Sequence, residues 1–220
     1  MTIQQQFIEF ALQSNVLRFG EFKTKAGRLS PYFFNAGLFN TGSLLDRLGE
    51  FYAKTLLAAK EEGRIEFDMI FGPAYKGVPL AASVAINLSR LGCDVPWAFN
   101  RKEAKDHGEG GSIVGYKPKD GDRVIIIEDV ITAGTAVRET MPVLKGCGDV
   151  KVNDMFISVN RCEVGQTPGK TAIMEVQEEF GIKVHALVTV QDIYEYLKEQ
   201  GTYGDVLPAM EKYMADYCVL

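Results

Sequence analysis

The sequence predicts an α/β fold in which helices flank a central, mostly parallel sheet. Two patterns support this prediction. Strand-like and helix-like segments alternate between residues 67 and 190, and this alternation is typical of parallel strands joined by crossover helices. The run from Val124 to Ile127 is apolar throughout, as expected of a strand that is buried on both faces. The 220 residues suffice for one domain with a small appendage.

The spacing of apolar residues predicts each element in turn. Residues 3–13 have the period of a helix, and residues 17–34 fit two short strands around a turn at 25–27. We expect residues 17–42 to form a small hood outside the sheet, and residues 100–115 to form a mobile lid loop. Further helices are predicted at 43–59, 78–90, 134–145, 172–180, 193–199 and 208–217, and sheet strands at 67–71, 96–99, 123–128, 151–159 and 183–190.

Composition and charge argue against several classes of protein. The formal net charge is -5, whereas nucleic-acid-binding domains usually carry a basic surplus. No stretch approaches the roughly 20 apolar residues of a membrane span, and the first residues lack the pattern of a signal peptide. We therefore expect a cytoplasmic protein that binds neither nucleic acid nor a membrane. No C-x-x-C pair occurs among the cysteines, which argues against structural zinc and favours reduced thiols: Cys93, Cys147, Cys162 and Cys218.

The most informative segment is VIIIEDVITAGTAV, residues 124–137. Its strand ends in Glu128 and Asp129, and a loop of small residues then leads into a helix. Backbone N–H groups at a helix start, together with the helix dipole, suit a phosphate dianion. Carboxylates at the end of such a strand can accept hydrogen bonds from neighbouring sugar hydroxyls. The simpler interpretation is an ordinary turn with two solvated acids. Neither G-x-x-x-x-G-K-[ST] nor G-x-G-x-x-G occurs.

Two further segments carry cations beside glycines. In FGPAYKGVPLA, residues 71–81, Lys76 lies in a glycine-proline turn that leads into a helix, which predicts a second anion site. A plain turn with a surface lysine is the alternative. In residues 99–115, four cations precede a run of glycines, which fits a mobile lid over a polyanion or, alternatively, a solvated loop. These cations are Arg101, Lys102, Lys105 and His107.

The segment at 19–42 combines a cation with aromatic side chains. Lys25 is expected on a hairpin turn, and the Phe33-Phe34 pair follows it. Such a combination suits a flat, anionic, heteroaromatic ring. The alternative is a hairpin whose aromatic pair belongs to the core.

These segments resemble the type I phosphoribosyltransferases, and in particular the members that act on orotate. The resemblance covers the segments at 19–42, 71–81, 99–115 and 124–137 in the same order, together with ISVNRCEVG at 157–165. It implies the fold of that family. It also implies the Mg2+-dependent transfer of phosphoribosyl from phosphoribosyl pyrophosphate (PRPP) to orotate in UMP biosynthesis.

The resemblance also implies roles for individual residues. Those expected to contact orotate are Lys25, Phe33, Phe34, Thr132 and Arg161. Those expected to contact the pyrophosphate are Tyr75, Lys76, Arg101, Lys102, Lys105 and His107. Those expected to hold the ribose 5-phosphate are Glu128, Asp129, Val130, Ile131, Thr132, Ala133, Gly134, Thr135 and Ala136. The catalytic residues among them would be Lys102, Lys105, His107 and Asp129.

Three wider expectations follow from the resemblance. Mg2+ would be held mainly by PRPP and water, without an assigned protein ligand. The chain would form a homodimer in which each lid loop serves the neighbouring subunit. The pyrophosphate loop of the family often contains a non-proline cis peptide, for which Ala74–Tyr75 is the candidate. His185, in a predicted strand, is expected to be a structural histidine.

Three other functions remain to be weighed at this point. A purine-base phosphoribosyltransferase would share the segment at 124–137 but not the hood or the lid sequence. A PRPP-sensing regulator would need a DNA-binding segment, which is not visible in the sequence. A nicotinamide-dependent dehydrogenase is disfavoured by the missing glycine fingerprint.

Overall fold

The computed structural model describes residues 1–24, 27–105 and 111–220. Within them lies a six-stranded sheet of order β5-β4-β3-β6-β7-β8. All neighbouring strands are parallel except β4 and β5, which are antiparallel. The expected mostly parallel sheet is therefore confirmed. Its strands are β3 (Met69–Gly72), β4 (Trp97–Lys105), β5 (Gly111–Gly115), β6 (Arg123–Ile127), β7 (Lys151–Asn160) and β8 (Lys183–Thr189).

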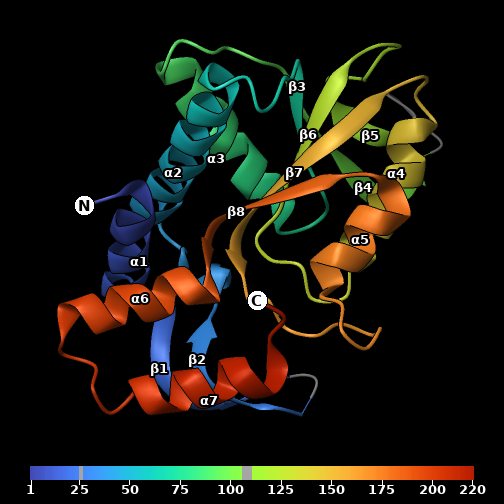
Figure 1. The fold of residues 1–220 in the computed structure, drawn as a ribbon. Helices are drawn as coiled ribbons and strands as arrows, with labels where there is room; N and C mark the ends of the chain where they lie inside the picture. The colour runs from blue at the N-terminus through green and yellow to red at the C-terminus, as the bar shows by residue number, and fades with distance from the viewer. Residues whose placement is uncertain (25–26, 106–110) are drawn as a thin grey trace.

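Helices cover both faces of this sheet (Figure 1). On one side lie α1 (Ile3–Gln13), α2 (Gly42–Glu61) and α3 (Gly77–Arg90), and on the other lie α4 (Thr135–Lys145) and α5 (Ala172–Phe180). Each side has its own apolar cluster of buried residues. The central strand β6 supplies both clusters, because Ile125 and Ile127 belong to one and Val124 and Ile126 to the other. This alternation explains why the strand shows no polar positions.

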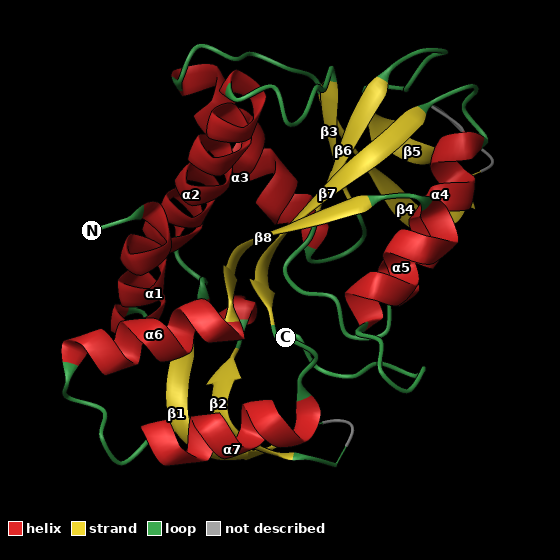
Figure 2. Ribbon diagram, viewed as in Figure 1, coloured by secondary structure: helices red, strands yellow, loops and turns green. Residues whose placement is uncertain are grey.

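The hood forms a separate layer at one end of the molecule (Figure 2). Strands β1 (Leu17–Lys23) and β2 (Leu29–Phe34) pair antiparallel in a sheet of their own, followed by the short 3-10 helix η1 (Ala36–Leu38). Helices α6 (Val190–Gln200) and α7 (Leu207–Tyr217) lie beside this hairpin. The first and last parts of the chain therefore pack together at the hood. None of the helices in the described residues is long and apolar enough to cross a membrane.

The direction in which the chain winds through the sheet reverses between β3 and β6. From β3 the chain continues outward to β4, whereas from β6 it continues in the opposite direction to β7 and β8. The neighbours β3 and β6 therefore flank the point at which the winding reverses. In open α/β sheets, ligands bind at the carboxyl ends of the strands beside such a point.

The structure differs from the sequence-based expectation most clearly at residues 100–115. We expected a loop, but β4 extends to Lys105 and β5 begins at Gly111. The two strands pair antiparallel, with Asn100 opposite Ile113. The prediction of a loop was therefore wrong for the described parts of this segment. Charged residues and glycines favour a loop, but here the pairing of β4 with β5 supplies the backbone hydrogen bonds of a sheet. Residues 106–110 of the expected lid lie outside the described residues.

Candidate active site

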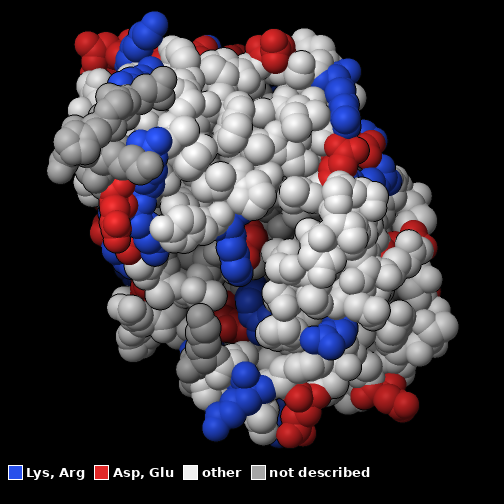
Figure 3. All heavy atoms as spheres, turned by 180° about the vertical axis from the view of Figure 1, so that it is seen from behind, with Lys and Arg blue, Asp and Glu red and all other residues white. Residues whose placement is uncertain are grey.

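The two loops at the winding reversal meet through an ion pair. Lys76 follows β3, Asp129 follows β6, and the Lys76 Nζ lies 2.7 Å from the Asp129 Oδ2. The Asp129 side chain is 10% exposed and that of Lys76 is 64% exposed, so one buried carboxylate faces one accessible cation. The sequence predicted both residues as ligand contacts, and the structure brings them together. Figure 3 shows basic and acidic side chains next to one another in a hollow on the rear face of the molecule.

Backbone hydrogen bonds fix the two acids at the end of β6. The Glu128 amide donates to the Phe156 carbonyl (3.0 Å), and the Ser158 amide donates to the Asp129 carbonyl (2.8 Å). The Tyr52 hydroxyl, which is fully buried on α2, lies 2.8 Å from the Glu128 carbonyl oxygen and donates to it. Tyr52 and Ser158 therefore anchor the acidic segment. The sequence does not indicate this role of Tyr52, because the partner of its hydroxyl is set by tertiary packing.

Glu128 has an unusual protonation equilibrium for a carboxylate. Burial raises its pKa from 4.5 to about 8, and the negative charge of neighbouring Asp129 also raises it, against a hydrogen bond from the Asp129 amide. That amide donates to the Glu128 Oε1 at 3.1 Å. Titratable groups with strongly shifted pKa values are typical of functional sites.

The helices that begin at this site lack side-chain caps. Helices α1, α2, α5 and α6 each begin after a threonine whose hydroxyl accepts a backbone amide proton. Helices α3 and α4 begin after Lys76 and Gly134 without any side-chain cap, as α7 does in the hood after Val206. Capping side chains normally satisfy the free N–H groups of the first turn. Their absence at these two starts leaves donors for an anion at both loops.

The loop between β6 and α4 is shaped by a glycine. Gly134 has a φ of 71°, and a Cβ at this position would lie 2.6 Å from the Val176 Cγ2. Within the loop, the amides of Ile131 to Gly134 donate to no described residue. Val130 differs from this pattern, since its amide already donates to the Asp129 Oδ1 (2.8 Å). The residues expected to contact the phosphate therefore lie on one loop. The amide of Val130 is already hydrogen-bonded to Asp129, unlike the amides that follow it.

The loop after β3 is held by a neighbouring strand. The peptide bond Ala74–Tyr75 is cis. The Ala74 amide donates to the Asn100 Oδ1 at 3.0 Å. Asn100 is buried on β4 at 6% exposure, and the sequence analysis did not single it out. A signal was available, because a polar residue directly precedes the expected cations Arg101 and Lys102.

The expected pyrophosphate contacts lie partly together. Tyr75 is 70% exposed, and the Lys102 Nζ lies 5.7 Å from the centroid of its ring. The same nitrogen is 3.9 Å from the Glu139 Oε2 on α4. Arg101 and Lys102 both belong to β4, beside Tyr75 in one open cavity. His107 lies outside the described residues, and for Lys105 the description covers only its backbone at the end of β4.

The expected orotate contacts come from two places. Arg161 follows β7, and its guanidinium lies 4.3 Å from the ring centroid of Tyr32 in the hood. The adjacent residues Phe33 and Phe34 do not share one environment. Phe33 is 38% exposed and stacks with Phe22, whereas Phe34 packs against the core through Phe7. Successive residues of a strand face opposite sides, so the expected aromatic pair is split. Thr132 lies on the β6–α4 loop, and Lys25 lies outside the described residues.

His185 has the surroundings of a structural histidine, as expected. Its Nε2 lies 2.6 Å from the Asp154 Oδ1, and its ring stacks on Phe156 with centroids 4.6 Å apart. The cysteines are all free thiols, and none forms a disulfide.

Comparison with known proteins identifies the family of this arrangement. Residues 41–153 match the phosphoribosyl transferase domain. The orotate phosphoribosyltransferase of Thioalkalivibrio sulfidiphilus is 53% identical over 219 residues, covering 99% of both chains. That of Pseudomonas aeruginosa is 51% identical over 215 residues, covering 97% of both. The solved orotate phosphoribosyltransferase of Francisella tularensis has a TM-score of 0.85 at 38% identity, covering 97% of this chain and 99% of that one. The chain therefore belongs to the orotate phosphoribosyltransferase family, as the sequence resemblance predicted.

Proposed function

We propose that this chain transfers the phosphoribosyl group of PRPP to orotate, giving orotidine 5′-monophosphate and pyrophosphate in UMP biosynthesis. One observation carries the proposal: two uncapped helix starts, at Lys76 and Gly134, flank the winding reversal, and the 2.7 Å Lys76–Asp129 pair joins their loops. Each helix start suits one phosphorylated end of PRPP. The acids between them suit the ribose hydroxyls.

In this proposal the β6–α4 loop holds the ribose 5-phosphate. The unengaged amides from Ile131 to Gly134 and the start of α4 at Thr135 would receive the phosphate. Side-chain oxygens of Glu128 and Asp129 would accept hydrogen bonds from the ribose hydroxyls. Lys76 would exchange part of its contact with Asp129 for the incoming substrate, which its exposure permits.

The pyrophosphate would lie across the β3–α3 loop and the start of the lid. Arg101 and Lys102 line one cavity with Tyr75, and Lys76 follows Tyr75 in the chain. These three cations would neutralise the pyrophosphate, and Lys105 and His107 would complete its surroundings when the lid closes. Pyrophosphate leaves the anomeric carbon as positive charge builds on the ribose ring, and orotate N1 attacks from the opposite face. The proton that N1 loses is taken up by the pyrophosphate product. The protein therefore acts mainly by positioning the reactants and by stabilising the leaving charge. Closure would also exclude water from the activated sugar.

Orotate would lie between the hood and the end of β7. Arg161 and Lys25 would bind its anionic groups, Phe33 or Phe34 would contact its ring, and Thr132 would contact it from the β6–α4 loop. The separation of Phe33 from Phe34 leaves the exposed Phe33 more accessible to a ligand.

The residues present fit Mg2+ that is carried mainly by the substrate. Both oxygens of Asp129 already have protein partners, the Lys76 Nζ and the Val130 amide. The described residues contain no group of three or more possible metal ligands. Oxygen atoms of pyrophosphate, ribose and water are the ligands Mg2+ prefers, with few from protein. When bound, Mg2+ would neutralise charge on the pyrophosphate.

We further propose a cytoplasmic homodimer in which each lid serves the neighbouring site, as the family resemblance implies. The base specificity is tested by mixing the protein, PRPP and Mg2+ with orotate, uracil, adenine or hypoxanthine in separate reactions. Orotate absorbance and pyrophosphate release are followed. Among the four bases, only orotate is expected to be turned over. Faster turnover with adenine or hypoxanthine would favour a purine-base enzyme and contradict the proposal.

A further inference from the structure

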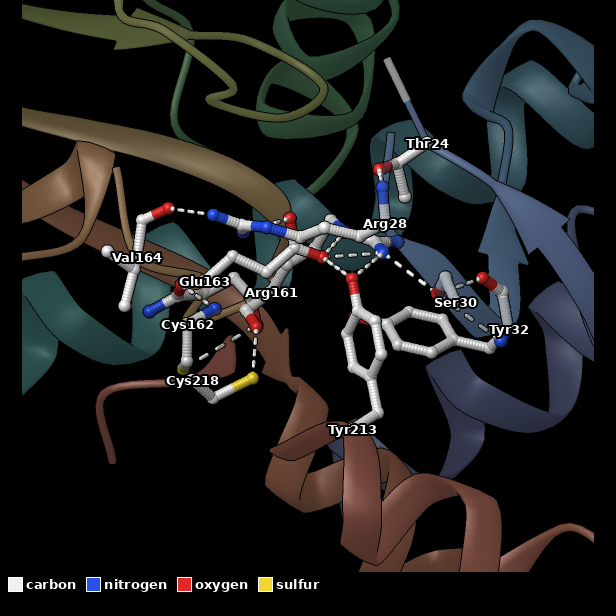
Figure 4. Close-up of polar contacts among 11 residues, drawn as sticks. Thr24, Arg28, Ser30, Tyr32, Arg161, Cys162, Glu163, Val164, Tyr213 and Cys218 are labelled. Atoms are coloured by element: carbon white, nitrogen blue, oxygen red, sulfur yellow. Dashed lines mark hydrogen bonds and ion pairs between the residues drawn. The ribbon is translucent and has the colours of Figure 1, made fainter. Parts of the chain in front are cut away.

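A cluster of polar side chains joins the hood, the end of β7 and the C-terminal helix (Figure 4). We call it the Arg161 cluster, and it consists of Arg28, Ser30, Tyr32, Arg161, Glu163 and Tyr213. These residues come from β2 and its turn, from the segment after β7, and from α7. The cluster therefore connects three parts of the chain that are far apart in sequence.

The guanidinium of Arg161 is held on several sides. Its Nε donates to the Glu163 Oε1 at 2.7 Å, and its Nη2 donates to the Ser30 Oγ at 3.1 Å. One face of the group packs on the Tyr32 ring, and the side chain is only 16% exposed. A buried cation is stable only when it is paired and hydrogen-bonded. These contacts therefore fix the orientation of the group, while its Nη1 donates to none of the residues that the structure describes.

Tyr213 and Glu163 also hold the Arg161 guanidinium, through hydrogen bonds to it and to each other. The Tyr213 hydroxyl donates to the Glu163 Oε1 at 2.6 Å and accepts from the Arg161 Nη2 at 3.5 Å. Tyr213 is 3% exposed, and burial raises the pKa of its hydroxyl to about 12, so the group keeps its proton. The Glu163 Oε2 lies 3.5 Å from the Arg28 Nη1. One carboxylate thus connects the hood, Arg161 and α7.

Arg161 lies close in the chain to a residue that hydrogen-bonds to the acidic segment at the end of β6. The Ser158 amide, three residues earlier in the chain, donates to the Asp129 carbonyl at 2.8 Å. The end of β7 therefore adjoins the acidic segment assigned to ribose. A cation fixed there favours a base that carries a carboxylate over one that lacks it, since an oriented guanidinium binds a carboxylate in a defined geometry.

We propose that Glu163 and Tyr213 are positioning residues that hold Arg161 in the orientation which binds orotate. The proposal rests on the proposed function, because it takes orotate as the ligand of Arg161. Through Tyr213, helix α7 would contribute to base recognition without touching the base. Glu163 would contribute in the same way from the segment after β7.

The first test compares two tyrosines on the same helix. Tyr213→Phe removes the hydroxyl that contacts Glu163 and Arg161 but keeps the ring. Tyr217→Phe removes a hydroxyl that bonds to no described residue, one turn further along α7. We expect Tyr213→Phe to raise the KM for orotate about 10-fold, the usual effect of one hydrogen bond to a charged group. The KM for PRPP should stay within about twofold. Tyr217→Phe should change neither.

The second test asks whether the effect passes through Arg161. The affinity for orotidine 5′-monophosphate is measured by calorimetry for wild type, Tyr213→Phe, Arg161→Ala and the double variant. Tyr213→Phe should weaken binding in wild type and add almost nothing in Arg161→Ala, because the group it supports is gone. Glu163→Gln should behave in the same way as Tyr213→Phe.

The outcomes separate this inference from the proposed function. A wild-type protein that turns over no orotate would refute the function and the inference together. A wild-type protein that turns over orotate, with an unchanged orotate KM in both Tyr213→Phe and Glu163→Gln, would overturn the positioning role alone. Equal losses for orotate and PRPP, or an undiminished effect in the Arg161→Ala background, would also overturn it.

Discussion

The Nζ of Lys76 and the Oδ2 of Asp129 lie 2.7 Å apart, although 53 residues separate them in the chain. Lys76 immediately precedes α3 and Asp129 follows β6, so the pair connects the two loops at the winding reversal of the sheet. A single phosphorylated sugar can therefore reach both loops.

Asp129→Asn keeps the shape of the side chain but removes its charge. The amide cannot form the ion pair with Lys76, and it accepts hydrogen bonds from ribose hydroxyls less strongly. We expect turnover to fall at least about 100-fold, as for the loss of one preorganised electrostatic group. Steady-state kinetics measures the loss, and thermal unfolding should show an intact fold. Full activity would contradict the role given to Asp129.

Lys105→Ala tests the lid. The proposed function assigns Lys105 to the departing pyrophosphate, so the loss of its charge should lower turnover roughly 100- to 1000-fold. The affinity for PRPP should fall less, because most contacts to the substrate remain. Turnover and PRPP affinity are measured separately, by single-turnover kinetics and by calorimetry. An unchanged turnover would remove the lid from the mechanism.

Gly77→Ala tests the close approach of the two loops. A Cβ on Gly77 would lie 2.8 Å from the Pro73 Cδ and 2.9 Å from the Ile127 carbonyl oxygen, both closer than normal contacts. The loop must shift, so we expect a higher KM for PRPP and a loss of about 1–3 kcal/mol of stability. Gly204→Ala is the matched control, since nothing lies within 4 Å of its added Cβ. Equal behaviour of the two variants would show that the approach of the loops is unimportant.

Glu128→Gln separates stability from activity. The pKa of Glu128 rises from 4.5 to about 8 in the fold, so the folded protein binds this proton more tightly than the unfolded chain. The contribution of Glu128 to stability is therefore lost as pH rises from about 4.5 to about 8. Gln cannot ionise and can still accept from the Asp129 amide. At pH 7 the variant should be about 1–3 kcal/mol more stable than wild type, yet less active.

Urea unfolding of both proteins between pH 5 and pH 8.5 measures this difference. The gap in unfolding free energy should grow with pH and level off above about pH 8. A gap that is independent of pH would show that Glu128 ionises normally in the fold.

The segments with local signals were predicted best. The apolar strand at 124–127 and the acids and small loop after it lie together in sequence, so the strand and the start of the following helix could be predicted from the sequence. The contact of Lys76 with Asp129 depends on β3 lying beside β6, which is a property of strand order. The sequence predicted both residues as ligand contacts but did not predict their contact with each other.

Other features depended on tertiary packing that leaves no local signal. The β4–β5 pairing extends through residues whose charges and glycines suggested a loop. Asn100 and Tyr52 act through partners on other elements, the Ala74 amide and the Glu128 carbonyl. Phe33 and Phe34 have different surroundings because successive residues of a strand face opposite sides. The prediction of an aromatic pair at the ligand did not take this alternation into account.

The most direct test of the central claim, that each loop binds one end of PRPP, is fragment binding to Thr135→Ala. Calorimetry would measure the affinity of wild type and variant for ribose 5-phosphate and, separately, for pyrophosphate. Because Thr135 begins α4 at the phosphate loop, ribose 5-phosphate should bind about 10-fold more weakly to the variant, as for one hydrogen bond to a charged group. The affinity for pyrophosphate should be unchanged. Equal weakening of both fragments, or of neither, would contradict the assignment of the two ends to two loops.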